Sequence, residues 1–304
     1  MAGSKTEFEV LLEKELAYGK TESFPVRTCA VRRLLTRKAE CKQLHPNPQD
    51  EFCLPDIGPN YEIIAAYERQ FRYDDMNGQT YYCGDPILVE RLYPEGYRIL
   101  NGHHRWAAAL RMGKKTIPIH IVNVMHEADV KRILEQSRHT KRAAIDLDEV
   151  ILGTEENGPL EKELSVLWNR FYQMRIRKGV PALFHFLNEN GYDIWLFSAQ
   201  YYSFDTIQNY FRKYHAEISG IVTAPRKNLQ NADRGKSLER MIMDRYEYTV
   251  HIDNDTVVQI YPGEKDYRMV ELKAEPADWS RAVIEAISGI EKESKKQDIH
   301  ESIV

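Results

Sequence analysis

Acidic residues follow two short apolar runs in the second half of the chain. Asp146 and Asp148, one residue apart, end the run AAIDLD, and Asp253 follows the run YTVHI. Carboxylate oxygens are the ligands that Mg²⁺ prefers, and the ion takes one or two of them together with water and substrate phosphate. Asp146, Asp148 and Asp253 are therefore the candidate ligands of a magnesium ion.

These acids have the chemistry that phosphoryl transfer requires. Asp146 is the candidate nucleophile, which would attack phosphorus and form an aspartyl-phosphate. Asp148 is the candidate proton donor to the leaving oxygen, and afterwards the base that activates water. Ser198, the last residue of the run WLFS, would donate a hydrogen bond to the transferring phosphoryl group. The sequence thus predicts a magnesium-dependent phosphoryl-transfer site.

A lysine that neutralises phosphate oxygens is expected beside these acids. Lys236 opens the helical stretch KSLERMIMDRY, which leads into the run before Asp253. Lys227, in APRKN, follows another apolar run and is the alternative. Lys236 is favoured over Lys227 because it lies at the start of a predicted helix.

Each of these features is common when it stands alone. Two acids spaced as in DxD are more often part of a turn or a helix cap, and serine commonly caps helices. The prediction of a shared site rests on the order of Asp146, Ser198 and Asp253 at the ends of successive predicted strands.

The string LNGHHRWAAAL is the candidate site of the first half. A predicted strand turns through Gly102 into a helix, whose first amides would form an anion site with His103, His104 and Arg105. The alternative is structural: one histidine caps or packs against the helix, and Arg105 pairs with a surface acid.

The elements that would position the acids alternate between strand and helix. The predicted strands are Ala143–Leu147, Asp193–Phe197, Gly220–Thr223, Thr249–Ile252 and Tyr267–Leu272. This alternation predicts a parallel sheet covered by helices, with ligands bound beyond the carboxyl ends of its strands.

A second, smaller α/β unit is predicted upstream. Two strands, PILVERL and YRIL, precede the helix GHHRWAAALRMG, and a third strand lies in Ile117–Val124. The polar string SRHTKR marks a boundary, so we expect domains at 1–138 and 139–290. The last residues, 291–304, have few apolar side chains and are expected to form a flexible tail.

The acidic motifs resemble those of the haloacid dehalogenase-like (HAD) phosphatase superfamily. D-L-D-E-V, from Asp146 to Val150, matches the first motif DxDx[TV]; W-L-F-S matches the second, and H-I-D-N-D approximates the fourth. The resemblance implies a Rossmannoid parallel sheet. Asp148 is the acid that phosphatases of the superfamily have and dehalogenases lack. The stretch Gly153–Gly179 is too short for a large cap, and a small cap implies an open site for bulky substrates.

The GHHR string resembles the ParB/sulfiredoxin-like fold, and most of all its free serine kinases. The kinase motif is DGHHR, in which Asn101 here replaces the aspartate, and His103 stands where sulfiredoxins have a catalytic cysteine. The upstream segment His45–Phe52 is similar to the one that precedes the nucleotide site. The resemblance implies a bound nucleotide, ATP, ADP or CTP, and Glu51 as the candidate catalytic base. A solvated turn acid is the alternative for Glu51.

The composition excludes few classes of protein. The chain is 42% hydrophobic and 29% charged, with a net charge of -4, whereas a dedicated polyanion binder is usually basic. A phosphorylated small molecule or a nucleotide is thus the expected partner, and nucleic acid the second choice. In that polynucleotide alternative, the GHHR string binds a nucleotide as a regulatory switch and the second domain acts on the phosphate end of a polynucleotide. The four cysteines are expected to be reduced thiols. No apolar run is long enough for a membrane span, so a cytoplasmic protein is expected.

Overall fold

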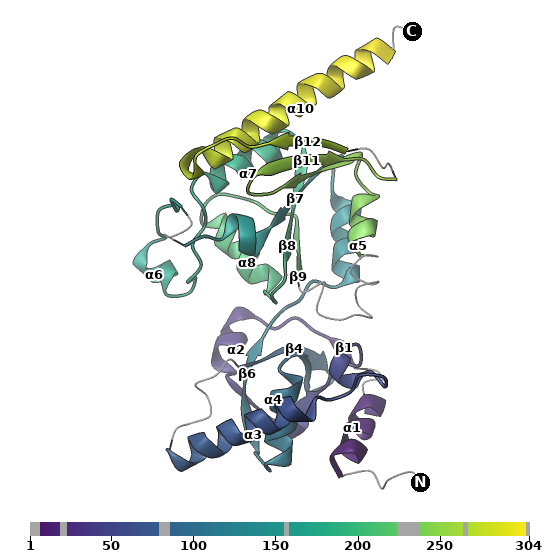
Figure 1. Cartoon of the computed structure of the whole chain (residues 1–304), viewed down its shortest axis with the longest axis vertical. Helices are drawn as coiled ribbons and strands as arrows, with labels where there is room; N and C mark the ends of the chain where they lie inside the picture. The colour runs from purple at the N-terminus through teal and green to yellow at the C-terminus, as the bar shows by residue number, and fades with distance from the viewer. Residues whose placement is uncertain are drawn as a thin grey trace. The chain divides into compact units, whose positions relative to one another are not determined.

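The computed structural model describes residues 7–18, 23–78, 86–154, 158–223, 238–263 and 267–301. The described chain forms two compact units, and the division between them falls after Val124. Each unit has its own sheet and its own buried core (Figure 1). The chain is therefore a two-domain α/β protein, as the sequence predicted.

The first unit is a mixed sheet with helices around it. Its helices are α1 (Glu7–Tyr18), α2 (Ala30–Leu35), α3 (Tyr61–Met76) and α4 (His103–Arg111), with 3₁₀ turns η1 (Cys41–Gln43) and η2 (Glu51–Cys53). Its strands are β1 (Phe24–Pro25), β2 (Lys38–Glu40), β3 (Leu44–His45), β4 (Ile87–Tyr93), β5 (Tyr97–Asn101) and β6 (Thr116–Ile121). The strand order is β2-β6-β4-β5-β3, with β1 paired to β4.

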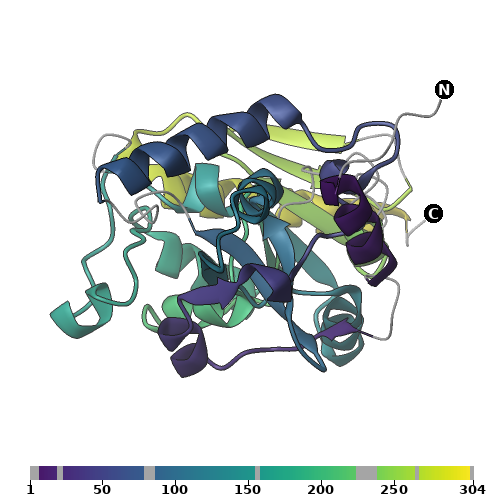
Figure 2. The ribbon, with the colours of Figure 1, turned by 90° about the horizontal axis from the view of Figure 1, so that it is seen from below.

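Helix α4 is the central helix of this unit because its apolar face is almost continuous. Trp106 and the three alanines after it are buried against the sheet. The indole Nε1 of Trp106 donates a hydrogen bond of 3.0 Å to the carbonyl oxygen of Cys41. The long helix α3, drawn in blue in Figure 2, packs against α4.

The second unit contains the remaining elements. Its helices are α5 (Glu127–Gln136), α6 (Val166–Asn169), α7 (Val180–Glu189), α8 (Phe204–Arg212) and α10 (Trp279–Glu301), with the π-helical turn η3 (Leu147–Ile151) and the 3₁₀ turn η5 (Pro276–Asp278). Its strands are β7 (Lys141–Asp146), β8 (Tyr192–Ser198), β9 (Gly220–Thr223), β10 (Tyr248–Ile252), β11 (Thr256–Ile260) and β12 (Tyr267–Glu271).

The sheet of the second unit has the order β12-β11-β10-β7-β8-β9. Strands β10, β7, β8 and β9 are parallel, as predicted. The prediction of a fully parallel sheet was wrong at one edge, where β11 and β12 join antiparallel to their neighbours. Only residues 253–255 link β10 to β11, and a parallel crossover needs about a dozen residues.

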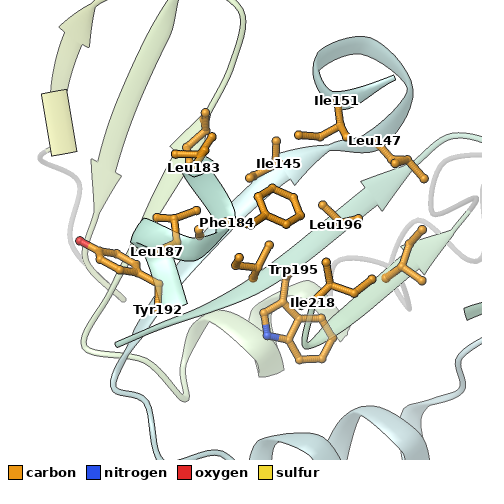
Figure 3. Packing of buried hydrophobic residues seen from close by; sticks show 14 of the residues in the cluster. Ile145, Leu147, Ile151, Leu183, Phe184, Leu187, Tyr192, Trp195, Leu196 and Ile218 are labelled. Atoms are coloured by element: carbon orange, nitrogen blue, oxygen red, sulfur yellow. The ribbon is translucent and has the colours of Figure 1, made fainter. Parts of the chain in front are cut away.

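Helix α7 covers one face of this sheet. Leu183, Phe184 and Leu187 are fully buried against Ile145 of β7 and Leu196 of β8 (Figure 3). Helix α10 packs in turn on α7 and on β11. This packing fixes the central strands, and with them the loops at their carboxyl ends.

Helix α5 belongs to the second unit rather than the first. Val130 and Leu134 are buried in the core that surrounds the parallel sheet, and Arg245 Nε donates to the carbonyl oxygen of Leu134 at 3.2 Å. The division after Val124 therefore differs from the boundary at residue 138, because the apolar side of α5 is covered by the second core.

The flexible tail predicted for residues 291–304 is helical as far as Glu301. Val283, Ile287 and Ile290 anchor the first turns of α10 in the core. No glycine or proline follows Gly289 in the described part of α10, so the backbone has no residue that would end the helix. Helical backbone therefore continues to Glu301.

None of the described helices combines the length and apolar character that crossing a membrane requires. Among the described residues, Cys29, Cys41 and Cys53 are free thiols, as predicted, while Cys83 lies outside them. Burial raises the pKa of Cys41 to about 11, so this thiol stays protonated near neutral pH.

Candidate functional site

Asp146 and Asp253 lie at the same edge of the second sheet. Strands β7 and β10 are parallel neighbours, and Ile145 pairs with Ile252. The residue after each of these isoleucines is an aspartate, so Asp146 ends β7 and Asp253 directly follows β10. The structure thus brings together two acids that about a hundred residues separate in the sequence.

Backbone amides hold one oxygen of each of these carboxylates. Asp146 caps the π-helical turn η3, and its Oδ1 accepts a hydrogen bond of 2.8 Å from the amide of Glu149. Asp253 Oδ1 accepts one of 2.7 Å from the amide of Asn254. Asp146 is half-buried and Asp253 is exposed. One oxygen of each acid is thus held by the backbone, and within the described residues the second oxygen is available for a ligand.

Asp148 uses both of its oxygens within the protein. Ser198 Oγ donates to Oδ2 at 2.6 Å, and the hydroxyl of Tyr202 donates to Oδ1 at 2.8 Å. The sequence predicted that Ser198 would donate to a phosphoryl group. In this structure Ser198 is 1% exposed, and its Oγ lies within hydrogen-bond distance of Asp148 Oδ2 and of the carbonyl oxygen of Gln200.

Tyr202 is a member of this cluster that the sequence did not identify. It lies in the loop between β8 and α8 and is half-buried, and both burial and its bond to Asp148 raise the pKa of its hydroxyl. Its neighbours in the string SAQYYSF carry no spacing that distinguishes it from a core tyrosine. Only the fold brings Tyr202 to Asp148.

The acids are not arranged as a ligand set of three. Within the described ranges, no group of three or more His, Cys, Asp and Glu side chains is placed to hold a metal ion. Asp148 is turned toward Ser198 and Tyr202, which leaves Asp146 and Asp253 as the pair with available oxygens. Two hard oxygen donors fit Mg²⁺, which keeps much of its water shell when proteins bind it.

Both candidate lysines, Lys236 and Lys227, lie outside the described residues. A described cation near the strand ends is Arg177, whose Nη1 donates to Asn254 Oδ1 at 2.8 Å. Asn254 Nδ2 donates in turn to the carbonyl oxygen of Glu149 at 3.2 Å. Asn254 therefore connects the loop after β10 both to Arg177 and to the turn after β7.

The stretch predicted as a small cap leaves the sheet after η3 and returns before α7. Two isolated bridges join its ends, Leu152 with Ile176 and Leu160 with Arg177. A cavity of about 60 Å³ lies at its base and reaches Asn254. Glu149 and Arg177 line this cavity, whereas Asp146, Asp148 and Asp253 are not part of its lining.

In the first unit, Gly102 makes the turn from β5 into α4. Its φ of 103° lies in the left-handed region, and a Cβ there would approach Ile87 Cγ1 to 3.1 Å. A side chain at this position would therefore meet both backbone strain and a close contact. Glycine allows the helix to begin directly above strand β4.

His103 and His104 accept hydrogen bonds from backbone amides. His103 Nε2 accepts from Asn47 and His104 Nε2 accepts from Asn60, each at 3.1 Å. Burial lowers the pKa of His103 to about 3 and also lowers that of His104. Both rings are therefore neutral near pH 7, and they hold the segment between β3 and α3 instead of presenting positive charge.

Aromatic side chains surround the histidines and the arginine of the same string. The ring of Phe52 stacks on His103, with centroids 5.5 Å apart, and meets His104 edge-on. The guanidinium of Arg105 lies 5.3 Å from the ring centre of Tyr67, and its buried Nη1 has no partner among the described residues. Glu51 precedes Phe52 in η2 and is partly buried.

Residues 83–137 match the family model of the ParB N-terminal domain. The match includes β4, β5 and the GHHR turn, and it ends before β7. No curated protein matches the chain.

Among solved structures, a free serine kinase mutant in complex with AMP is 16% identical over 78% of this chain and 92% of its own, with a TM-score of 0.20. A second mutant, in complex with ADP, is 16% identical over 84% and 97%, with a TM-score of 0.21. Scores this low establish no shared fold for the whole chain. What the comparisons establish is a ParB-like segment at residues 83–137.

Proposed function

We propose that the second unit is a magnesium-dependent phosphohydrolase or phosphotransferase with Asp146 as its nucleophile. The observation that carries the proposal is the pairing of β7 with β10, which sets Asp146 beside Asp253 at the carboxyl edge of a parallel sheet. Ligands of open α/β sheets bind at this edge. The HAD-like motifs DLDEV, WLFS and HIDND fall on the same three strand ends.

The described residues have distinct roles in such a reaction. The free oxygen of Asp146 attacks phosphorus, and the bond from phosphorus to the leaving oxygen breaks as Asp148 gives that oxygen a proton. Asp148 then removes a proton from water, whose oxygen bonds to phosphorus while the bond to Asp146 breaks. Both carboxylates return to their initial state, and inorganic phosphate is released.

Asp146 and Asp253 are the residues that would hold magnesium. When bound, the ion supplies positive charge that offsets the negative phosphate oxygens. The exposure of Asp253 favours a site open to solvent. Such a site suits a bulky substrate.

Replacing Asp146 by asparagine tests the nucleophile. We expect Asp146→Asn to abolish the hydrolysis of p-nitrophenyl phosphate that EDTA also abolishes, because an amide cannot form the aspartyl-phosphate. Asp278→Asn, at an exposed acid paired with Arg281, is the matched control and should retain activity. Equal activity of purified Asp146→Asn and wild type would exclude the proposed mechanism.

A phosphate-release screen would define the substrate class. The panel is nucleotides, phospho-amino acids, sugar phosphates, and oligonucleotides phosphorylated at the 3′ or the 5′ end, each with magnesium and with EDTA. Selective release from the oligonucleotides, with binding that weakens steeply as salt rises, would support the polynucleotide alternative. Selective release from a small phosphate ester would exclude it.

For the first unit we propose nucleotide binding. A further proposal is that the unit also transfers a phosphoryl group from the nucleotide, as a kinase does. The ParB-like match and the left-handed turn at Gly102, which presents the first amides of α4, support an anion site there. If Glu51 acts as the base, phosphoryl transfer from ATP or ADP to free serine should occur and be lost in Glu51→Gln. Nucleotide binding without transfer would limit this unit to ligand binding.

A further inference from the structure

Two hydroxyl groups hold the carboxylate of Asp148, one at each oxygen. Tyr202 donates to Oδ1 at 2.8 Å and Ser198 to Oδ2 at 2.6 Å. Given the proposed phosphoryl transfer, on which this inference rests, we propose that Tyr202 is the positioning residue of Asp148. It fixes which carboxylate oxygen delivers the proton to the leaving group.

The hydroxyl of Tyr202 is held against one oxygen of Asp148. Tyr202 lies in the loop between β8 and α8, and its hydroxyl is 2.8 Å from Asp148 Oδ1. A phenol that stays protonated has one proton to donate, and here that proton goes to Oδ1 of Asp148. Oδ1 is thus occupied whether Asp148 is charged or neutral.

Ser198 differs from Tyr202 because it has a second acceptor. Its Oγ lies 3.1 Å from the carbonyl oxygen of Gln200 as well as 2.6 Å from Asp148 Oδ2. When Asp148 is ionised, the Ser198 proton stabilises Oδ2. When Oδ2 gains a proton, the Ser198 hydroxyl can turn to Gln200 without losing its hydrogen bond. Oδ2 is therefore the oxygen that gains and loses the catalytic proton.

The amide of Gln200 keeps Ser198 in place during this exchange. It donates to Ser198 Oγ at 2.9 Å, so the oxygen is held while its proton changes acceptor. Ser198 is the last residue of β8 and Tyr202 lies in the loop that follows it, whereas Asp148 lies in the turn after β7. The acid is thereby fixed by an element other than its own.

The consequence is specific to proton transfer. Without the Tyr202 hydroxyl, the carboxyl group of Asp148 can rotate and exchange its two oxygens, so a smaller fraction of molecules has the proton aligned. The release of a leaving group that needs a proton should become slower. p-Nitrophenolate is a stable anion that needs little protonation, so the rate of its release should fall much less.

The experiment compares Tyr202→Phe with wild type on two probes, p-nitrophenyl phosphate and β-glycerophosphate. The value of kcat/KM reports formation of the aspartyl-phosphate, in which Asp148 acts as the acid. We expect Tyr202→Phe to lower it by about tenfold or more for β-glycerophosphate and by less than about threefold for p-nitrophenyl phosphate, since general acids contribute about 10²–10⁴-fold. Asp148→Asn removes the acid itself, so its loss of kcat/KM on each probe gives the largest loss to expect.

Tyr214→Phe is the matched control, because it removes a hydroxyl that donates to the carbonyl oxygen of Lys162 at 3.1 Å in the same unit. It should change neither value. Equal losses of Tyr202→Phe on the two probes, or no loss on either, would overturn the inference while leaving the proposed function intact. A wild-type protein without magnesium-dependent hydrolysis would overturn both.

Discussion

At the scale of single residues, burial decides the chemistry of the GHHR histidines. A solvated histidine pair beside a helix start is a plausible phosphate site, and the sequence supported that interpretation. The Nε2 atoms of His103 and His104 instead accept hydrogen bonds from the backbone amides of Asn47 and Asn60. Any anion bound near α4 would therefore rely on backbone amides and Arg105 for its positive partners.

His103 also makes the stability of the protein depend on pH. Its pKa is about 3 in the folded chain and 6.5 in the reference state, so the unfolded chain binds more protons between these values. Stability therefore falls as pH decreases below about 6.5. One such histidine should lower the free energy of unfolding by about 2 kcal/mol between pH 7.5 and 5, since each pKa unit corresponds to about 1.4 kcal/mol.

Urea unfolding at several pH values tests this prediction. The pKa values of His104 and His251 are also lowered by burial, so they add to the slope in the same direction. His103→Gln keeps an acceptor near Nε2 and removes the titrating ring, which should flatten the slope. His185→Gln, at an exposed position of α7, should leave it unchanged. Identical slopes for wild type and His103→Gln would contradict the prediction.

At the scale of elements, strand β9 is fixed by the packing of Trp195 over Gly220. The two residues pair across β8 and β9, and a Cβ on Gly220 would approach the indole to 2.4 Å. Trp195 is fully buried, and its Nε1 donates to the hydroxyl of Tyr246. The indole therefore has little freedom to move away.

Two glycine-to-alanine substitutions should have opposite effects on stability. Gly220→Ala should destabilise the second unit by about 1–3 kcal/mol, the usual cost of overpacking a core. Gly289 lies inside α10, and a Cβ there would meet nothing within 4 Å, so Gly289→Ala should stabilise the protein by about 0.5–1 kcal/mol. Thermal unfolding of both variants measures the two changes in stability. If both substitutions stabilise the protein, or both destabilise it, this account of β9 is refuted.

At the scale of the whole molecule, α5 decides where one unit ends and the next begins. The ParB-like match extends to residue 137, yet the apolar side of α5 packs in the second core. Similarity in sequence and the packing of side chains therefore place the boundary differently. The packing determines which unit depends on α5 for its stability.

Leu134→Ala in the full chain tests this assignment. Leu134 is 6% exposed, and truncating a buried leucine usually costs about 2–5 kcal/mol. Hydrogen exchange should accelerate in β7, β8 and β10 and stay unchanged in β4, β5 and β6. The reverse pattern would mean that α5 stabilises the first unit.

The sequence by itself determined the type of most elements and the residues at their ends. Apolar runs bounded by polar residues gave the parallel strands, and Asp146, Ser198 and Asp253 could be placed at strand ends before any pairing was known. These features are local, because backbone preference and hydrophobic period act over a few residues. The roles of these residues in catalysis stay a prediction.

Tertiary structure alone decided which of these strand ends lie side by side, and which other side chains contact the residues there. Tyr202 contacts Asp148 and α5 packs on the second core, although nothing in the neighbouring sequence distinguishes these outcomes. Each depends on burying apolar surface and pairing polar groups between segments far apart in the chain. Such interactions exist only once the chain has folded, so local sequence patterns do not encode them.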